Sequence, residues 1–168
     1  ELSNTIVKQI YLLRHADSDW SNLNQHDFYR SLSKKGIQEA SKLSNFFKNQ
    51  TISVDKVFCS SSERTKQTFD MCSDGLGYPI TNTTYLDRLY LAGVDEIISL
   101  IKELSESTSS ILIIGHNPAM LDLVNIFSNN KINDYPSCSL SEIIVESLWK
   151  DLSLKKCKLK SVCKPQEF

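Results

Sequence analysis

Short apolar runs alternate along the chain with segments whose apolar residues recur at helical spacing. The runs occupy residues 10–13, 54–59, 111–114, 143–145 and 157–162. The first three are rich in branched side chains and predict strands that are buried on both faces of a sheet. The last two flank a polar stretch around Asp151 and predict a pair of strands joined by a turn.

Four helices are predicted between these strands, over residues 37–47, 64–71, 94–104 and 120–127. In the first helix Ile37, Ala40, Leu43 and Phe47 form one apolar stripe, and Ser33 is placed to cap the N-terminus. Strands that alternate with helices predict an α/β fold, in which a mainly parallel sheet is covered on both faces. The C-terminal pair would add an antiparallel edge. The length of 168 residues suits a single domain over residues 1–168.

The composition is that of an ordinary globular protein. Hydrophobic residues make up 40% of the chain and charged residues 23%, which excludes a disordered, collagen-like or coiled-coil protein. A net charge of −1 provides no positive field for nucleic acid, so no nucleic-acid partner is expected. The lysines between Lys150 and Lys164 interleave with apolar residues, which favours an exposed edge strand over a polyanion site.

The apolar runs and the cysteines bear on where the protein works. No run reaches the length of a membrane span, and we therefore expect no membrane partner. The five cysteines are scattered and form no Cys-x-x-Cys pair, which favours a reducing compartment and a cytoplasmic location. Whether Glu1 is a native or a trimmed start stays open at this point.

Chemistry-bearing side chains follow three of the predicted strands. Arg14 and His15 end the first strand, Arg64 opens the helix after the second, and His116 follows the third. Because the carboxyl ends of parallel strands meet at one edge of a sheet, we expect the four side chains to share one crevice. Guanidinium groups match phosphate oxygens, and a histidine with its second ring nitrogen held by a hydrogen bond is a nucleophile toward phosphorus. The sequence therefore predicts a phosphoryl site built from side chains.

Each of these residues also has a purely structural interpretation. Arg14 and His15 could be a solvated strand end, Arg64 a surface arginine, and His116 a turn residue before Asn117-Pro118. The functional interpretation depends on their coincidence, because three separate strand ends each supply a group compatible with phosphate.

Three motifs surround these side chains: Leu12-Leu13-Arg14-His15-Ala16, Ser60-Ser61 with Arg64-Thr65 and Gln67-Thr68, and Gly115-His116-Asn117-Pro118. Together they resemble the histidine phosphatase superfamily, also called phosphoglycerate-mutase-like. Arg30, Leu32-Ser33 and Gly36 further resemble a segment of its small branch, the SixA-type phosphohistidine phosphatases. The resemblance extends from about Ile10 to Pro165.

The resemblance implies a three-layer α/β/α sandwich and a phosphate pocket without a metal or other cofactor. In it His15 would be the nucleophile that is transiently phosphorylated. Arg14, Arg64 and His116 would bind the phosphoryl oxygens and stabilise the charge of the transition state. Ser21 stands where mutases carry an asparagine that touches phosphate, so it would bind substrate weakly. Only residues 18–29 and 73–85 could wall the pocket, which favours a phosphatase over a mutase.

The proton donor is the least defined role. Asp87, three residues before Tyr90, stands where larger members of the superfamily carry a glutamate. Asp17 and Asp19 follow the nucleophile closely and compete for the same role. A donor matters most for an alkoxide leaving group and less for the imidazole of a phosphohistidine.

The sequence therefore favours a metal-independent phosphatase that works through a phosphohistidine on His15 and acts on phosphohistidine or another phosphoprotein. The alternatives are a phosphomonoesterase for a small phosphate ester, a non-catalytic phosphate-binding protein, and a metal hydrolase with His15, His116 and Asp17 as ligands. The last is disfavoured because two arginines would repel a cation. The physiological substrate and the oligomeric state do not follow from the sequence.

Overall fold

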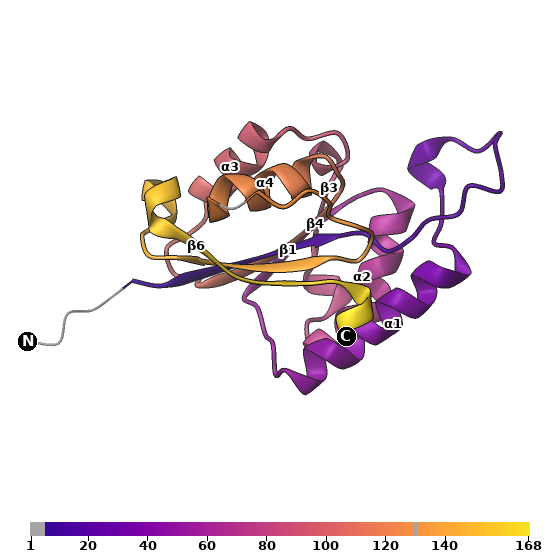
Figure 1. Ribbon diagram of the computed structural model, residues 1–168, viewed down its shortest axis with the longest axis horizontal. Coiled ribbons are helices and arrows are strands. Elements are labelled where there is room, and N and C mark those ends of the chain that lie inside the picture. The colour runs from indigo at the N-terminus through magenta and orange to yellow at the C-terminus, as the bar shows by residue number, and fades with distance from the viewer. Residues whose placement is uncertain (1–5, 130) are drawn as a thin grey trace, which may run out of the picture.

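The computed structural model describes residues 6–129 and 131–168, and its centre is a six-stranded sheet (Figure 1). The strands are β1 (Lys8–Arg14), β2 (Lys56–Ser60), β3 (Thr84–Leu86), β4 (Ser110–Gly115), β5 (Leu140–Val145) and β6 (Cys157–Cys163). They lie in the order β3-β2-β4-β1-β5-β6. The first four strands in that order are parallel, and β5 pairs antiparallel with both β1 and β6. The predicted mainly parallel sheet with an antiparallel edge is confirmed.

Helices cover both faces of the sheet, which gives the three layers expected from the resemblance (Figure 1). They are α1 (Lys34–Asn49), α2 (Glu63–Leu76), α3 (Val94–Lys102) and α4 (Ala119–Ser128). One hydrophobic core lies between the sheet and the pair α1 and α2, and a second lies between the sheet and the pair α3 and α4.

The central strands contribute side chains to both hydrophobic cores. Ile10 and Leu12 of β1 face α3 and α4, whereas Tyr11 and Leu13 face α1 and α2. Successive side chains of a strand point to opposite faces, so a strand buried on both faces must be apolar at every position. This is why the sequence shows solid runs here rather than an alternation of apolar and polar residues.

The start of α1 explains one departure from the predicted stripe. Ser33 caps the helix as expected, and its hydroxyl accepts a hydrogen bond of 3.0 Å from the Gly36 N–H. Ile37, however, is 46% exposed, and Glu39 takes a buried position instead. The Glu39 carboxylate accepts a hydrogen bond of 2.8 Å from the Asp17 N–H, which turns this side of the helix toward a polar loop. A Cβ on Gly36 would lie 2.0 Å from the Asp17 carbonyl oxygen, so only glycine permits this approach.

Two features of the fold were not predicted. Strand β3 has only three residues and lies at the sheet edge, where it overlaps the end of the stretch 73–85 that the sequence suggested as a pocket wall. It is too short and too exposed to leave an apolar run. The connection between β5 and β6 is also more than a polar turn, because Trp149 lies fully buried within it and donates a hydrogen bond of 2.8 Å to the Thr108 carbonyl.

Strand β6 forms the other edge of the sheet, as its interleaved lysines suggested. Lys158 and Lys160 are exposed, and Leu159 between them packs against the core beside α4. The edge strand is thus kept from pairing with other chains by charged side chains. Among the described residues no helix has both the length and the apolar character needed to span a membrane.

Candidate active site

The carboxyl ends of β1, β2 and β4 bring Arg14, His15, Arg64 and His116 into one place, which we call the crevice. Arg64 Nε lies 3.4 Å from His15 Nε2, and Arg64 Nη2 lies 3.4 Å from His116 Nδ1. The two imidazole rings are 5.2 Å apart between centroids. The arrangement follows from the parallel sheet, because the register aligns Arg14 with Gly115 directly before His116.

His15 is held in one tautomer. Its Nδ1 lies 2.7 Å from the Ala16 carbonyl oxygen, and because a carbonyl only accepts, Nδ1 must carry the proton. The lone pair of Nε2 then faces Arg64. Burial lowers the pKa of His15 to about 3, and the positive charges of Arg64 and Arg14 act in the same direction. At neutral pH the imidazole is therefore uncharged and has a free lone pair, as a nucleophile requires.

His116 is fixed from the neighbouring strand. Its Nε2 lies 2.8 Å from the hydroxyl of Ser60, the last residue of β2, and its Nδ1 faces Arg64. Burial, together with nearby His15 and Arg64, lowers the pKa of His116 to about 3. Both histidines are thus neutral in the free protein. A bound dianion would favour the protonation of His116, because opposite charges stabilise each other in a buried site.

Arg14 is anchored at one end and unsatisfied at the other. Its Nη1 donates a hydrogen bond of 3.0 Å to the Tyr135 carbonyl, which also accepts one of 2.9 Å from Asn117. Its Nε is buried and makes no hydrogen bond within the described part of the chain. Leaving such a donor unpaired costs about 1–3 kcal/mol. The Arg14 guanidinium is therefore well suited to an anionic ligand.

Asp27, which the sequence analysis did not single out, reaches the crevice from the loop before α1. Its carboxylate accepts hydrogen bonds from Arg64 Nη2 and Arg30 Nε, both at 3.1 Å, and from the Tyr90 hydroxyl. Its carbonyl oxygen accepts a further bond of 2.8 Å from Arg64 Nη1. Both terminal nitrogens of Arg64 are thus oriented by one residue, and this directs Nε toward His15.

The charge of Asp27 is fixed by these partners. Burial alone would raise its pKa, but the hydrogen bonds from Tyr90 and Arg30 and the charge of Arg64 bring the pKa of Asp27 down to about 2. The carboxylate is therefore ionised at neutral pH. The spacing of Asp27 and Arg30 within one turn is the pattern that could have marked the pair, because residues three apart in a helical turn face the same side.

Asp87 lies away from this network. It begins the exposed 3-10 turn Asp87–Leu89, and its carbonyl oxygen accepts a hydrogen bond from the N–H of Tyr90. Within the described ranges no hydrogen bond or ion pair joins its carboxylate to a side chain of the crevice. The residue thus positions Tyr90 through the main chain, and Tyr90 rather than Asp87 enters the crevice.

The other candidates near the nucleophile have local partners. Ser21 is exposed, and its N–H donates a hydrogen bond of 2.8 Å to the carboxylate of Asp19, which is also exposed. Asp17 accepts a hydrogen bond of 2.6 Å from the Ser33 hydroxyl and so supports the start of α1. Of the residues expected to bind or protonate substrate, Arg14, His15, Arg64 and His116 meet in the crevice, whereas Ser21 and Asp87 lie at its surroundings.

The described residues contain no group of three or more His, Cys, Asp or Glu side chains arranged to hold a metal ion. His15 and His116 share their surroundings with guanidinium groups instead. The donor set does not fit a cation, and the site geometry is that of an anion site.

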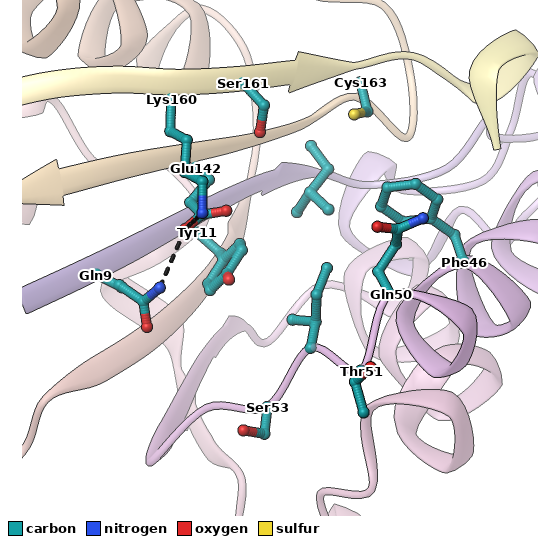
Figure 2. A pocket seen from close by; sticks show the side chains of 12 residues that line it. Gln9, Tyr11, Phe46, Gln50, Thr51, Ser53, Glu142, Lys160, Ser161 and Cys163 are labelled. Carbon is teal, nitrogen blue, oxygen red and sulfur yellow. Dashed lines mark hydrogen bonds and ion pairs between the residues drawn. The ribbon is translucent and has the colours of Figure 1, made fainter.

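Two hollows lie beyond the crevice. The larger, which we call the side cavity, measures about 500 Å³ and lies between the C-terminal end of α1 and strands β1, β5 and β6 (Figure 2). The smaller, which we call the apolar pocket, measures about 240 Å³ and adjoins the crevice at Tyr90 and His116. None of the four predicted crevice residues lines the side cavity.

The sequence profile of the histidine phosphatase superfamily (branch 1) matches residues 10–91, a span that contains Arg14, His15 and Arg64. A solved structure from Nakamurella multipartitia, assigned to the SixA phosphohistidine phosphatases, matches with a TM-score of 0.77 and 25% identity. The match covers 95% of this chain and 96% of that one. These similarities support an assignment to the histidine phosphatase superfamily.

Two further proteins are similar to this chain at comparable levels of identity. Phosphohistidine phosphatase SixA of Escherichia coli is 26% identical over 117 residues, which are 69% of this chain and 71% of the relative. An uncharacterised protein of Mycobacterium leprae is 27% identical over 161 residues, or 88% and 96% of the two chains. The similarity to the SixA-type branch is thus confirmed, and the protein is a phosphatase.

Proposed function

We propose that the protein removes the phosphoryl group from phosphohistidine, or from another phosphorylated side chain of a protein, through a phosphohistidine intermediate on His15. The observation that carries the proposal is the environment of His15. Its Nδ1 proton is held by the Ala16 carbonyl at 2.7 Å, and its Nε2 lone pair lies beside Arg64 Nε. A neutral, oriented imidazole beside guanidinium groups is the arrangement that an attack on phosphorus requires.

In the first step Nε2 of His15 attacks phosphorus, the new N–P bond forms, and the bond from phosphorus to the substrate nitrogen breaks. The Ala16 carbonyl accepts a hydrogen bond from Nδ1–H of His15 and so stabilises the positive charge that the His15 ring acquires. Arg14 and Arg64 would hold the equatorial oxygens, over which the charge of the transition state is spread. Because both are oriented before substrate arrives, little reorganisation is needed.

In the second step water attacks the phosphorus of the intermediate, the P–Nε2 bond breaks, and His15 returns to its neutral form. The water proton passes to the product phosphate or to solvent. His116, held by Ser60, would remain close to the phosphoryl oxygens in both steps.

The ionised state of Asp27 supports phosphohistidine over an alkyl ester as substrate. An alkoxide leaving group needs a proton donor, and the carboxylate that reaches the crevice has a pKa of about 2. When the ring of the substrate phosphohistidine carries a proton, its imidazole leaves in the neutral form. Its departure therefore depends less on a proton donor. Asp87 as general acid stays a prediction, and Asp87→Asn would test it by its effect on ester hydrolysis.

The test is to mix the protein with a radiolabelled phosphohistidine donor and to quench it rapidly. We expect label on the protein that is lost in acid, survives alkali and is absent from His15→Ala. Donor hydrolysis retained by His15→Ala would overturn the proposal. Activity that a chelator abolishes would return the metal hydrolase to consideration. The five unpaired cysteines are consistent with a reducing, cytoplasmic location, which fractionation would test.

A further inference from the structure

The apolar pocket lies directly beside the crevice and is closed at its base by the core. Leu89, Ile97 and Met120 form this base and are at most 5% exposed. Tyr90 and His116 belong to both the pocket and the crevice. A substituent beside a phosphoryl group bound in the crevice can therefore enter the pocket directly, past Tyr90 and His116.

The rim of the pocket presents apolar side chains to solvent. Leu91 lines the pocket and is 83% exposed. In the loop that carries Asp27, Trp20 is 66% and Leu23 90% exposed, and the Trp20 ring stacks on the Arg30 guanidinium at 3.4 Å. Phe28 of this loop packs edge-on against Tyr90 with ring centroids 5.1 Å apart, so the two rims are joined. Exposed apolar residues that border a site in this way mark an interaction surface.

The charges around the crevice restrict what can bind. The base of the crevice holds Arg14, Arg30 and Arg64, whereas residues 19–29 and 89–93 contain neither lysine nor arginine. The imidazole of His26 is the one titratable nitrogen base among them. A small polyanion with a second phosphate or a carboxylate would meet no further arginine or lysine there. A single phosphoryl group in an apolar setting fits the distribution of charge.

We propose that the apolar pocket is a subsite for an apolar side chain of a polypeptide substrate, next to its phosphorylated residue. The inference rests on the proposed phosphatase function and specifies its substrate. With the phosphoryl group in the crevice, the neighbouring side chain enters the pocket, and the polypeptide surface around it contacts Trp20 and Leu23. One well-placed apolar group changes kcat/KM by about 10–200-fold in pockets of this kind.

The test compares two phosphohistidine peptides of equal length and charge, one with leucine and one with serine on both sides of the phosphohistidine. We expect the protein to prefer the leucine peptide by about 10-fold in kcat/KM, mainly through KM. Leu91→Ser should reduce this preference to within about threefold. Gly93→Leu, at a lining position where an added Cβ meets no atom within 4 Å, should reduce it by filling the pocket. Leu154→Ser, at a leucine 58% exposed outside the pocket, should leave the preference unchanged.

Phosphoramidate has no group to fill the pocket and measures the phosphoryl chemistry separately. Its hydrolysis together with equal rates on the two peptides, or with no peptide hydrolysis, would overturn the subsite and leave the phosphatase function intact. A preference for phenyl phosphate over phosphoramidate without any peptide preference would assign the pocket to small esters and overturn the polypeptide subsite. Failure on phosphoramidate and both peptides would overturn the proposed function itself, and the subsite with it.

Discussion

The crevice and the side cavity are both lined by polar side chains, yet they differ in how those side chains are satisfied. In the side cavity the Glu142 carboxylate accepts a hydrogen bond of 3.1 Å from Gln9 and lies 3.6 Å from Lys160 (Figure 2). In the crevice Arg14 Nε is buried without a partner among the described residues, and neutral His15 lies beside guanidinium groups. The side cavity thus pairs its carboxylate with an ammonium, whereas the crevice pairs Arg64 and Arg30 with Asp27 and leaves Arg14 Nε without a partner.

This difference shows why volume alone does not find a phosphoryl site. A cavity of about 500 Å³ could hold a small molecule, but its carboxylate and ammonium are paired with each other. In the crevice Arg14, Arg30 and Arg64 face the single carboxylate of Asp27, so an excess of positive charge is left for an anionic ligand to balance. The comparison predicts that substitutions in the crevice lower activity, whereas substitutions in the side cavity leave activity almost unchanged.

The largest expected effect is that of His15→Ala. Removing the nucleophile should lower kcat on phosphoramidate by about 10⁴-fold or more, because no other oriented imidazole can form the N–P bond. The matched control is Glu142→Gln in the side cavity, which should leave kcat/KM within about twofold of the unchanged protein. Steady-state assays of both variants check the pair. Equal losses of activity would mean that the two hollows are coupled and would break the comparison.

Arg64→Ala should have the next largest effect. Loss of a positioned cation at the developing phosphoryl charge should lower kcat/KM by about 10²–10³-fold. Arg64→Lys should recover only part of the loss, since an ammonium cannot contact His15 and Asp27 at the same time as a planar guanidinium does. Full recovery of kcat/KM by Arg64→Lys would mean that the crevice requires only the positive charge and not the planar guanidinium.

Asp27→Asn should act through Arg64. The amide keeps the shape of the carboxylate but removes the charge that orients Nη2, and a misplacement of this kind costs about 10-fold or more in kcat. A positioning role predicts a change in kcat with the pH profile of kcat/KM preserved. A loss that appears only with ester substrates would instead identify Asp27 as a proton donor.

The strand ends that supply the crevice were predictable from the sequence, and the loop that completes it was not. Arg14, His15, Arg64 and His116 each follow a buried run or open a helix, so the parallel sheet alone places them together. Asp27 comes from a polar loop without periodicity, and its place depends on tertiary contacts with Arg64 and Tyr90. Local sequence carries no information on such contacts.

The same limit applies to the details of the fold. Ser33 was recognised as a helix cap because capping is local, whereas the exposure of Ile37 depends on how Glu39 meets the Asp17 loop. Tyr135, whose carbonyl holds both Arg14 and Asn117, lies more than 100 residues from Arg14 and had no recognisable pattern. Predictions from sequence succeeded where one segment decides and failed where two distant segments decide together.

The histidines of the crevice should also make stability depend on pH. Their pKa values lie at about 3 in the folded protein, below the ordinary 6.5, so between these values the unfolded chain binds more protons. The contribution of the two histidines to the free energy of unfolding is therefore full above about pH 6.5 and is lost as the pH falls toward 3. Urea titrations near pH 7 and pH 4.5 should show a lower midpoint in acid, and His116→Gln should reduce the difference. An unchanged difference in that variant would place the acid sensitivity outside the crevice.

The smallest expected effect lies in the side cavity, at Tyr11. Burial and, to a smaller extent, the charge of Glu142 raise the pKa of the Tyr11 phenol to about 12. The folded protein keeps this phenol neutral while the unfolded chain ionises it from about pH 10, so its contribution to stability is lost as the pH rises from 10 toward 12. Glu142→Gln should lower the pKa only part of the way, because burial remains. Phenolate absorbance compared with that of Tyr11→Phe would isolate this titration. A pKa unchanged in Glu142→Gln would mean that the carboxylate is satisfied by Gln9 and Lys160 so completely that Tyr11 does not sense it, which would sharpen the contrast with the unsatisfied crevice.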